Sequence, residues 1–248
     1  MEKIKYNKDN LLTVIGEGIE SIVYLYRDNK GNKVALKKFK DEYKLDNRII
    51  KIKEKTLLNK EKKLELLSKK ECMKDEIELR DLVYENDRFI GFTSTYEDNK
   101  PLYYYLDKNR KKKLKILNEL KEKVIKLNEN GIFIGDFNHD NFSIVNKKIK
   151  LFDIDNYKVD EYNFDIATAL INYYYKKCQR EEYIDNYCFN IYSISFLEDI
   201  PMSNVLNYLQ NYKLDSKKNE ELKIKILSPD NSYNGELFID NIKKGLFK

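Results

Sequence analysis

The pattern of apolar and polar positions in the first hundred residues predicts a β-sheet with one helix. The segment 11–18 is apolar and ends in glycines, 21–27 alternates in β-branched and aromatic residues, and 33–39 follows the turn DNKGN. From about 46 to 69 the apolar residues recur at helical spacing, at Ile50, Leu57, Leu58, Leu64 and Leu67. The stretches DLVYEN (81–86) and RFIGFTSTY (88–96) then predict a hairpin.

The rest of the chain has a mainly helical pattern. The polar stretch EDNKP (97–101) is the expected boundary, and 111–129 predicts an amphipathic helix that ends before Gly131. FSIV, NKK and IKLF (142–152) read as a hairpin, and a further helix is expected over 185–199. We therefore expect an α+β fold with two lobes in one domain, 1–248. The lobe 1–98 would be small and mainly β with one long helix, and the lobe 99–248 mainly α.

Composition narrows the function classes. With 248 residues, 42% of them hydrophobic, the chain can bury a sizeable core. The net charge of +5 comes from 47 basic and 42 acidic residues that are interleaved, so no specific nucleic-acid binding is expected. The basic run KNRKKKLK (108–115) could touch phosphates, but a solvated helix start is the preferred interpretation. Oligomeric state is left open.

Cysteine usage and hydropathy favour an intracellular protein. Three cysteines, Cys72, Cys178 and Cys188, lack the spacing of a zinc site. The first residues have no apolar signal-peptide core, and no uncharged run approaches the roughly 20 residues of a membrane span. We expect a cytoplasmic protein without a membrane span, in a bacterium or a phage-infected cell, with delivery into a host cell left open.

The stretch GEGIES (16–21) lies between two predicted strands. It does not open a helix, so it is no dinucleotide fingerprint, and it lacks the ending of a phosphate-binding P-loop. A glycine-rich flap over a phosphate remains, with a plain hairpin as the alternative. Lys37, in the apolar strand VALK, would have an anionic partner in that phosphate, since an unpaired buried ammonium is costly. The alternative is a lysine on the solvent face of the strand.

A second group of polar residues lies in IFIGDFNHDNFSIVNKKIKLFDID (132–155). Asp153 and Asn141 offer the oxygen ligands that Mg²⁺ prefers, and the predicted hairpin brings them together. Asp136 would orient an attacking hydroxyl and accept its proton. For His139, the only histidine, a place in the loop turn is preferred over proton transfer or metal binding. These are the groups that phosphoryl transfer needs.

The order and spacing of these motifs resemble those of protein kinases and their wider kinase-like relatives. Gly16, Gly18, Ser21 and Val23 match the glycine-rich loop with serine as its third member, and VALK matches the strand lysine motif. Asp136 to Asn141 matches the catalytic loop, and DID (153–155) stands where the family has D-F-G. Asp185, at the start of the last predicted helix, resembles the aspartate that anchors the catalytic loop.

The resemblance implies ATP and Mg²⁺ as cofactors and assigns roles to residues. Asp136, Lys37 and Asn141 would be catalytic, and Asn141 and Asp153 would hold the metal. Either Glu61, which is preferred, or Glu54 would pair with Lys37. The nucleotide-binding residues would be Ile15, Gly16, Gly18, Val23, Ala35, Lys37, Glu61 and Glu97.

The departures from the family pattern bear on regulation and substrate. Ile134 and Gly135 replace the histidine and arginine before Asp136, Asp155 replaces a glycine, and no A-P-E motif follows. The implied activity is that of a compact serine/threonine protein kinase acting on a protein hydroxyl. GDFNHDN and NFDIATAL (163–170) also resemble small-molecule kinases of the aminoglycoside or choline type, whose acceptor is a small alcohol. A nucleotide-binding pseudokinase is the alternative outside the enzymes.

Overall fold

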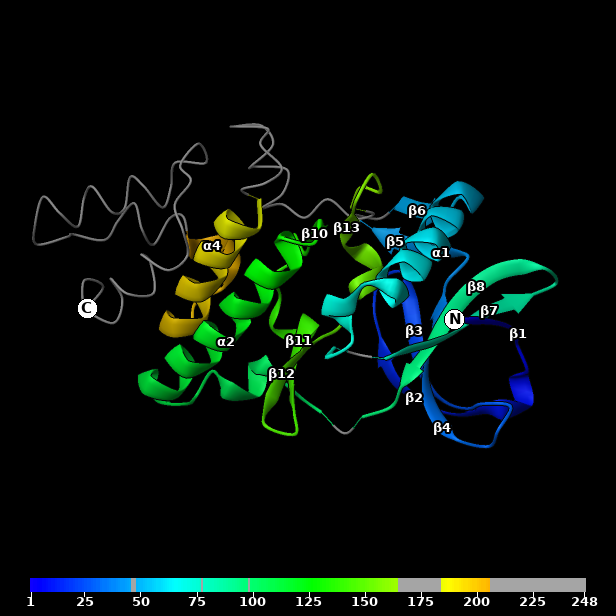
Figure 1. Ribbon diagram of the computed structural model, residues 1–248, viewed down its shortest axis with the longest axis horizontal. Coiled ribbons are helices and arrows are strands. Elements are labelled where there is room, and N and C mark those ends of the chain that lie inside the picture. The colour runs from blue at the N-terminus through cyan, green and yellow to red at the C-terminus, as the bar shows by residue number, and fades with distance from the viewer. Residues whose placement is uncertain (46–47, 77, 98, 165–183, 206–248) are drawn as a thin grey trace, which may run out of the picture. The chain divides into compact units, whose positions relative to one another are not determined.

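The computed structural model describes residues 1–45, 48–76, 78–97, 99–164 and 184–205 (Figure 1). The chain forms two compact units, Met1–Asp98 and Asn99–Lys248. The expected mixture of α and β structure is confirmed: the first unit consists mainly of β-strands, and both units contain helices. Among the described residues, no helix is long and apolar enough to cross a membrane.

The first unit is built on a six-stranded sheet in the order β1-β7-β8-β4-β3-β2. The strands are β1 (Glu2–Lys5), β2 (Leu11–Glu17), β3 (Ser21–Arg27), β4 (Lys33–Phe39), β7 (Leu79–Glu85) and β8 (Arg88–Thr95). The three strands expected between 11 and 39 and the following hairpin are confirmed. Neighbours are antiparallel except β1 and β7, which are parallel. The sequence pattern did not indicate β1.

Antiparallel pairing decides which residues share a face of this sheet. Directly opposite pairs are Gly16 with Val23, Val23 with Lys37, and Lys37 with Phe92. Successive side chains on a strand alternate between faces, so Ala35 and Phe39 lie on the same face as Lys37. We call this the lysine face. The opposite face is a buried cluster of Tyr26, Val34, Leu36, Val83 and Ile90.

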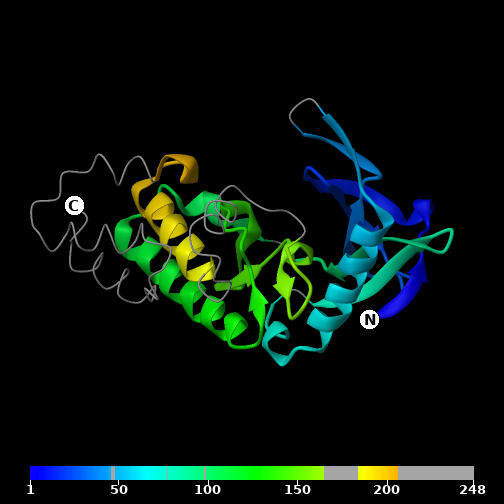
Figure 2. The same cartoon turned by 90° about the horizontal axis from the view of Figure 1, so that it is seen from above.

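Helix α1 (Glu54–Lys69) packs on the lysine face, where its Lys60 ammonium lies 5.2 Å from the centre of the Phe39 ring. The predicted helix from 46 is wrong in its first turns: β5 (Glu42–Leu45) and β6 (Arg48–Lys51) form a separate antiparallel strand pair, which projects from the rest of the first unit in Figure 2. Leu58 is exposed, whereas Lys60 and Lys63 are fully buried. The buried face of α1 is therefore more polar than its apolar spacing indicated.

The second unit combines two helices with small antiparallel sheets. Its helices are α2 (Arg110–Asn128) and α4 (Ile184–Glu198). Its strands are β9 (Lys100–Pro101), β10 (Ile132–Phe133), β11 (Phe142–Val145), β12 (Lys148–Leu151) and β13 (Lys158–Val159). The expected helices at 111–129 and 185–199 and the hairpin at 142–152 are confirmed. The positive φ of Gly131, 72°, ends the turn after α2.

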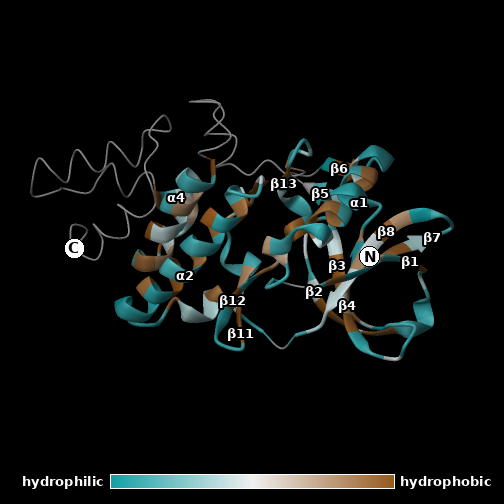
Figure 3. Cartoon of the chain, in the orientation of Figure 1, coloured by the Kyte–Doolittle hydropathy of each residue, from teal (hydrophilic) through white to brown (hydrophobic). Residues whose placement is uncertain are grey.

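Both helices bury apolar residues, to different extents. α2 buries one side, including Leu117, Leu120 and Val124, whereas α4 is buried almost all round, and brown positions follow it in Figure 3. In the basic run, Lys111 and Lys112 are exposed as expected. Lys113 is not: it is 5% exposed, its ammonium lies near the Phe196 ring, and burial lowers its pKa.

Candidate functional site

The glycine turn between β2 and β3 needs no glycine for its own geometry. Neither Gly16 nor Gly18 has a positive φ, and a Cβ on either would meet only ordinary contacts, at 3.7 Å from Val23 and 3.8 Å from Ser21. A side chain at Gly16 would instead project from the lysine face. The two glycines therefore leave space beside the backbone, which a closely approaching phosphate would require.

The turn is held in place by the residues that follow β4. The backbone N–H of Lys40 donates to the Glu20 carbonyl at 2.8 Å. The Lys40 ammonium donates to Glu17 at 2.7 Å and to the Gly18 carbonyl at 2.9 Å. No sequence pattern singled out Lys40, because its role depends on β4 ending beside the turn.

Four of the expected nucleotide-binding residues, Gly16, Val23, Ala35 and Lys37, share the lysine face. Lys37 is half-buried, so it is neither a core residue nor a freely solvated one. Ile15 lies at an irregularity in the β2–β3 register and is 42% exposed, and Glu97 follows β8. Gly91 permits the close pairing of β8 with β4, because a Cβ there would come within 2.1 Å of the Lys37 carbonyl oxygen.

The two candidate partners of Lys37 differ in burial. Glu61 is buried on α1, and Glu54 is exposed at the start of that helix. The Glu61 carboxylate accepts a hydrogen bond from the Lys3 ammonium at 2.9 Å and another from the Tyr84 hydroxyl. The hydrogen bond of Lys3 to Tyr84, and next its hydrogen bond to Glu61, raise the pKa of Lys3. The partners that the structure gives Glu61 thus come from β1 and β7, a pairing that sequence spacing could not indicate.

In the second unit, Asp185 fixes the backbone just before Asp136. Its carboxylate accepts hydrogen bonds from the N–H groups of Ile134 and Gly135, each at 2.8 Å. With its amide nitrogen turned toward them, Asn128 also donates to Asp185 and to the Ile132 carbonyl, each at 2.9 Å. The expectation that Asp185 anchors this loop is confirmed. Burial raises the pKa of Asp185 to about 7, and the two backbone donors limit that rise.

Gly135 has a φ of 67°, a conformation that favours glycine. The N–H of Asp136 donates to the Ile134 carbonyl at 2.7 Å, which closes a three-residue turn over Gly135. A side chain at this position would therefore be strained. This is the physical reason for a glycine at position 135.

Asp136 and Asn141 are in direct contact. The Asn141 amide nitrogen donates to the Asp136 carbonyl at 3.0 Å and to its carboxylate at 3.1 Å. His139 is placed by packing: its ring lies against both Tyr192 and Phe196, its Nδ1 is 3.1 Å from the Tyr192 hydroxyl, and burial lowers its pKa. The preferred interpretation of His139 as part of the loop turn agrees with this contact.

The β11–β12 hairpin brings Asn141 and Asp153 to one end. Phe142 pairs with Leu151, and the N–H of Phe152 donates to the Asn141 carbonyl at 2.8 Å. Asp153 has a φ of 57°, and its carboxylate accepts a hydrogen bond from the Asn156 amide at 2.8 Å. Asn156 was not among the residues predicted from the sequence. Its position three residues after Asp153 is the signal that could have indicated this hydrogen bond.

The chemistry of this pair fits Mg²⁺, which is commonly held by one or two carboxylates together with substrate phosphates and water. Asp153 and Asn141 offer one carboxylate and one amide oxygen. In the described part of the chain, no group of three His, Cys, Asp or Glu side chains is gathered to hold a metal by itself. The metal would thus depend on phosphate oxygens for part of its coordination.

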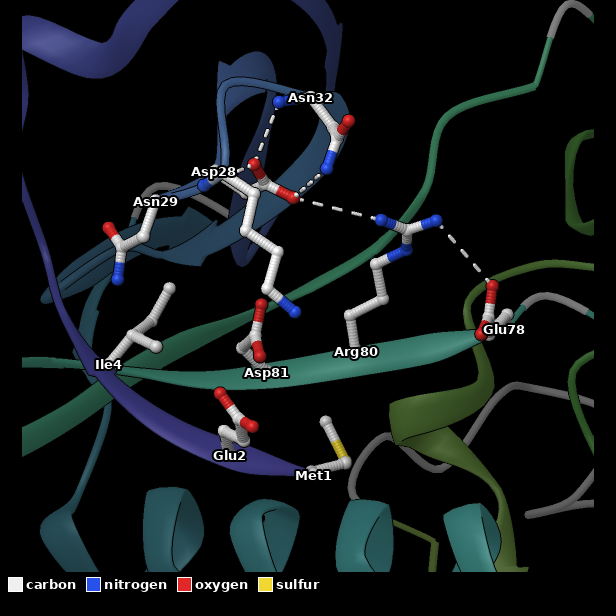
Figure 4. A pocket seen from close by; sticks show the side chains of 10 residues that line it. Met1, Glu2, Ile4, Asp28, Asn29, Asn32, Glu78, Arg80 and Asp81 are labelled. Atoms are coloured by element: carbon white, nitrogen blue, oxygen red, sulfur yellow. Dashed lines mark hydrogen bonds and ion pairs between the residues drawn. The ribbon is translucent and has the colours of Figure 1, made fainter.

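A hollow of about 510 Å³ lies at the other end of β3 from the glycine turn (Figure 4). Asp28 at its rim accepts hydrogen bonds from the backbone and side chain of Asn32 and faces Arg80, which also faces Glu78. These residues bind one another, and β3 with its seven residues separates them from Gly18 by roughly 20 Å. This hollow is therefore not part of the candidate phosphate site.

Comparison with protein-family models and with curated proteins gives no match. The site therefore has to be judged on its own geometry. The D-I-A stretch at 165–167, Cys178 and most of the segment between Asp153 and Asp185 lie outside the described residues. The likeness to small-molecule kinases stays a prediction at those positions.

Proposed function

We propose that the protein is an ATP- and Mg²⁺-dependent phosphotransferase of the kinase-like type, with the hydroxyl of a protein serine or threonine as the favoured acceptor. The observation that supports it best is the loop from Ile134 to Asn141. Asp185 fixes its backbone, and Asn141 binds Asp136 directly. A general base has to be held in place to be effective, and this loop is held from both sides.

Each residue would have a separate part in the transfer. When bound, ATP would supply the phosphoryl group, and Mg²⁺ would neutralise much of the negative charge on its phosphates. Asp153 and Asn141 would hold the metal, and Asn156 orients the Asp153 carboxylate. Asp136 would orient the acceptor hydroxyl and take up its proton. Lys37 and the glycine turn, in the first unit, would bind phosphate oxygens through an ammonium and backbone N–H groups.

The test is phosphate transfer from γ-labelled ATP by the purified chain, with Mg²⁺ and with EDTA. We expect label on protein acceptors in a lysate treated to inactivate its own kinases, and none with EDTA or with Asp136→Ala. Label on small alcohols such as aminoglycosides or choline would instead favour the small-molecule alternative. Nucleotide binding without any transfer would favour the pseudokinase.

A further inference from the structure

Glu20 at the tip of the glycine turn points into the first unit rather than into solvent. Its side chain is 13% exposed and its carboxylate lies 3.7 Å from the ammonium of Lys60, which is 0% exposed. The backbone carbonyl of Glu20 accepts a hydrogen bond from Lys40. An ordinary hairpin tip has polar side chains in water, so the inward direction of Glu20 requires an explanation.

Three separate segments meet at this carboxylate. Lys60 comes from the middle of α1, and Tyr43 of β5 hydrogen-bonds to Glu20. Burial and the negative charge of Glu20 together raise the pKa of Tyr43. The ring of Phe39 lies 5.2 Å below the Lys60 ammonium. The Glu20 carboxylate therefore connects the tip of the glycine turn with α1, through the ion pair with Lys60, and with β5, through the hydrogen bond with Tyr43.

Stability alone does not explain a fully buried lysine on α1. Removing an ammonium from water is costly, and a well-packed apolar residue of similar volume is often at least as stabilising. Lys62, two positions along the same helix, is exposed and shows the ordinary place for a lysine. An ion pair does, however, restrict where its partners lie: the Lys60 ammonium holds the Glu20 carboxylate in one position, which an apolar contact would not do.

We propose that Lys60 is a positioning residue that acts through Glu20 to hold the glycine turn in the conformation that binds nucleotide phosphate. The inference rests on the proposed function for its ligand, a nucleoside triphosphate with Mg²⁺. The backbone N–H groups of the turn bind phosphate only when the turn is ordered, so a held turn spares the ligand the entropy of ordering it. Lys60 itself touches no reacting atom.

The first experiment measures hydrogen exchange by mass spectrometry in peptides that cover residues 16–21, without nucleotide. We expect faster exchange in Lys60→Met and Glu20→Gln than in the wild type, and wild-type exchange in the control Lys62→Met. Because Lys60→Met leaves a buried carboxylate and could fail to fold, the double variant Glu20→Gln/Lys60→Met, which removes both charges, is the decisive one. Wild-type exchange at 16–21 in a folded double variant would overturn the proposal.

The second experiment measures the Kd of ATP with Mg²⁺ by calorimetry on the same folded proteins. We expect a Kd at least about fivefold higher in each single variant and in the double variant, with no further loss on combining the two. Lys62→Met should stay within about twofold of the wild type. Effects that simply add would show that Glu20 and Lys60 act independently, against the proposal. A wild type that binds no ATP would remove the proposed function, and the exchange experiment would still decide whether Lys60 holds the turn.

Discussion

At the scale of single residues, the structure gives Asp153 and Asp136 different surroundings. Asp153 lies at the end of the β11–β12 hairpin with Asn156, while Asp136 lies in the loop that Asp185 anchors. The two carboxylates should therefore be separable by mutation, although both belong to the same candidate site.

We expect Asp153→Ala to abolish Mg²⁺-dependent nucleotide binding, because it removes the carboxylate that joins metal to phosphates. Asp136→Ala should leave the Kd of ATP within a few-fold and lower turnover at least about 100-fold, since it acts on the hydroxyl. Calorimetry and labelled-ATP transfer measure the two effects. Equal loss of ATP affinity in both variants would contradict these roles.

Asp185 gives a prediction about pH. Its pKa is raised to about 7 in the folded protein from an ordinary value of 3.8. Between about pH 4 and 7 the unfolded chain releases this proton and the folded chain keeps it, so this group makes the folded protein progressively less stable as pH rises. Asp185→Asn cannot ionise, and it also loses one acceptor for the N–H groups of Ile134 and Gly135.

We therefore expect Asp185→Asn to destabilise the protein by about 1–3 kcal/mol near pH 5 and by less near pH 8. Urea unfolding at the two pH values measures the difference. A penalty that grows from pH 5 to pH 8 would mean that Asp185 is ionised in the folded protein well below pH 7.

At the scale of elements, a substitution in the glycine turn should change nucleotide binding without lowering the stability of the fold. Gly16→Ala adds a methyl group that meets only Val23 at an ordinary distance, but it projects from the lysine face. We expect unchanged stability or a gain of up to about 1 kcal/mol, together with a several-fold rise in the Kd of ATP.

Gly31→Ala is the matched control, in the turn at the far end of β3. Gly31 has a φ of 82°, so alanine there should cost about 1–2 kcal/mol while leaving nucleotide affinity unchanged. Thermal unfolding and calorimetry distinguish the two variants. If Gly16→Ala binds ATP as the wild type does, the turn is a plain hairpin.

At the scale of the whole molecule, the turn at Gly135 bears on regulation. An arginine that could dock a phosphorylated segment cannot occupy this position without strain, because φ is 67° and the N–H of Gly135 binds Asp185. We expect the chain to be active as translated, and phosphatase treatment to change turnover by less than about tenfold, which equals 1.4 kcal/mol. Phosphate mapping before and after treatment is the measurement. A larger loss would mean that another basic residue docks a phosphate.

Several elements followed from the sequence alone. Strands β2, β3, β4, β7 and β8 were predicted from runs of β-branched and aromatic residues between turn residues. Helix α2 was predicted because its apolar residues recur at helical spacing, and α4 from its helical pattern as a whole. The spacing of Asp136, Asn141 and Asp153 likewise placed the last two at one end of a hairpin, since the turn between β11 and β12 is short and local. The β5–β6 hairpin was missed because Ile50 fits the spacing of the helix that follows.

The tertiary structure alone decided the long-range pairs. Glu61 binds Lys3 and Tyr84, and Glu20 binds Lys60, across separations in sequence that no local periodicity reports. From the sequence alone, a lysine is expected in solvent. The burial of Lys60 follows only from the packing of α1 on the lysine face beside the glycine turn. Local patterns determine which elements form, whereas the packing of elements far apart in the chain determines which charges have to be paired.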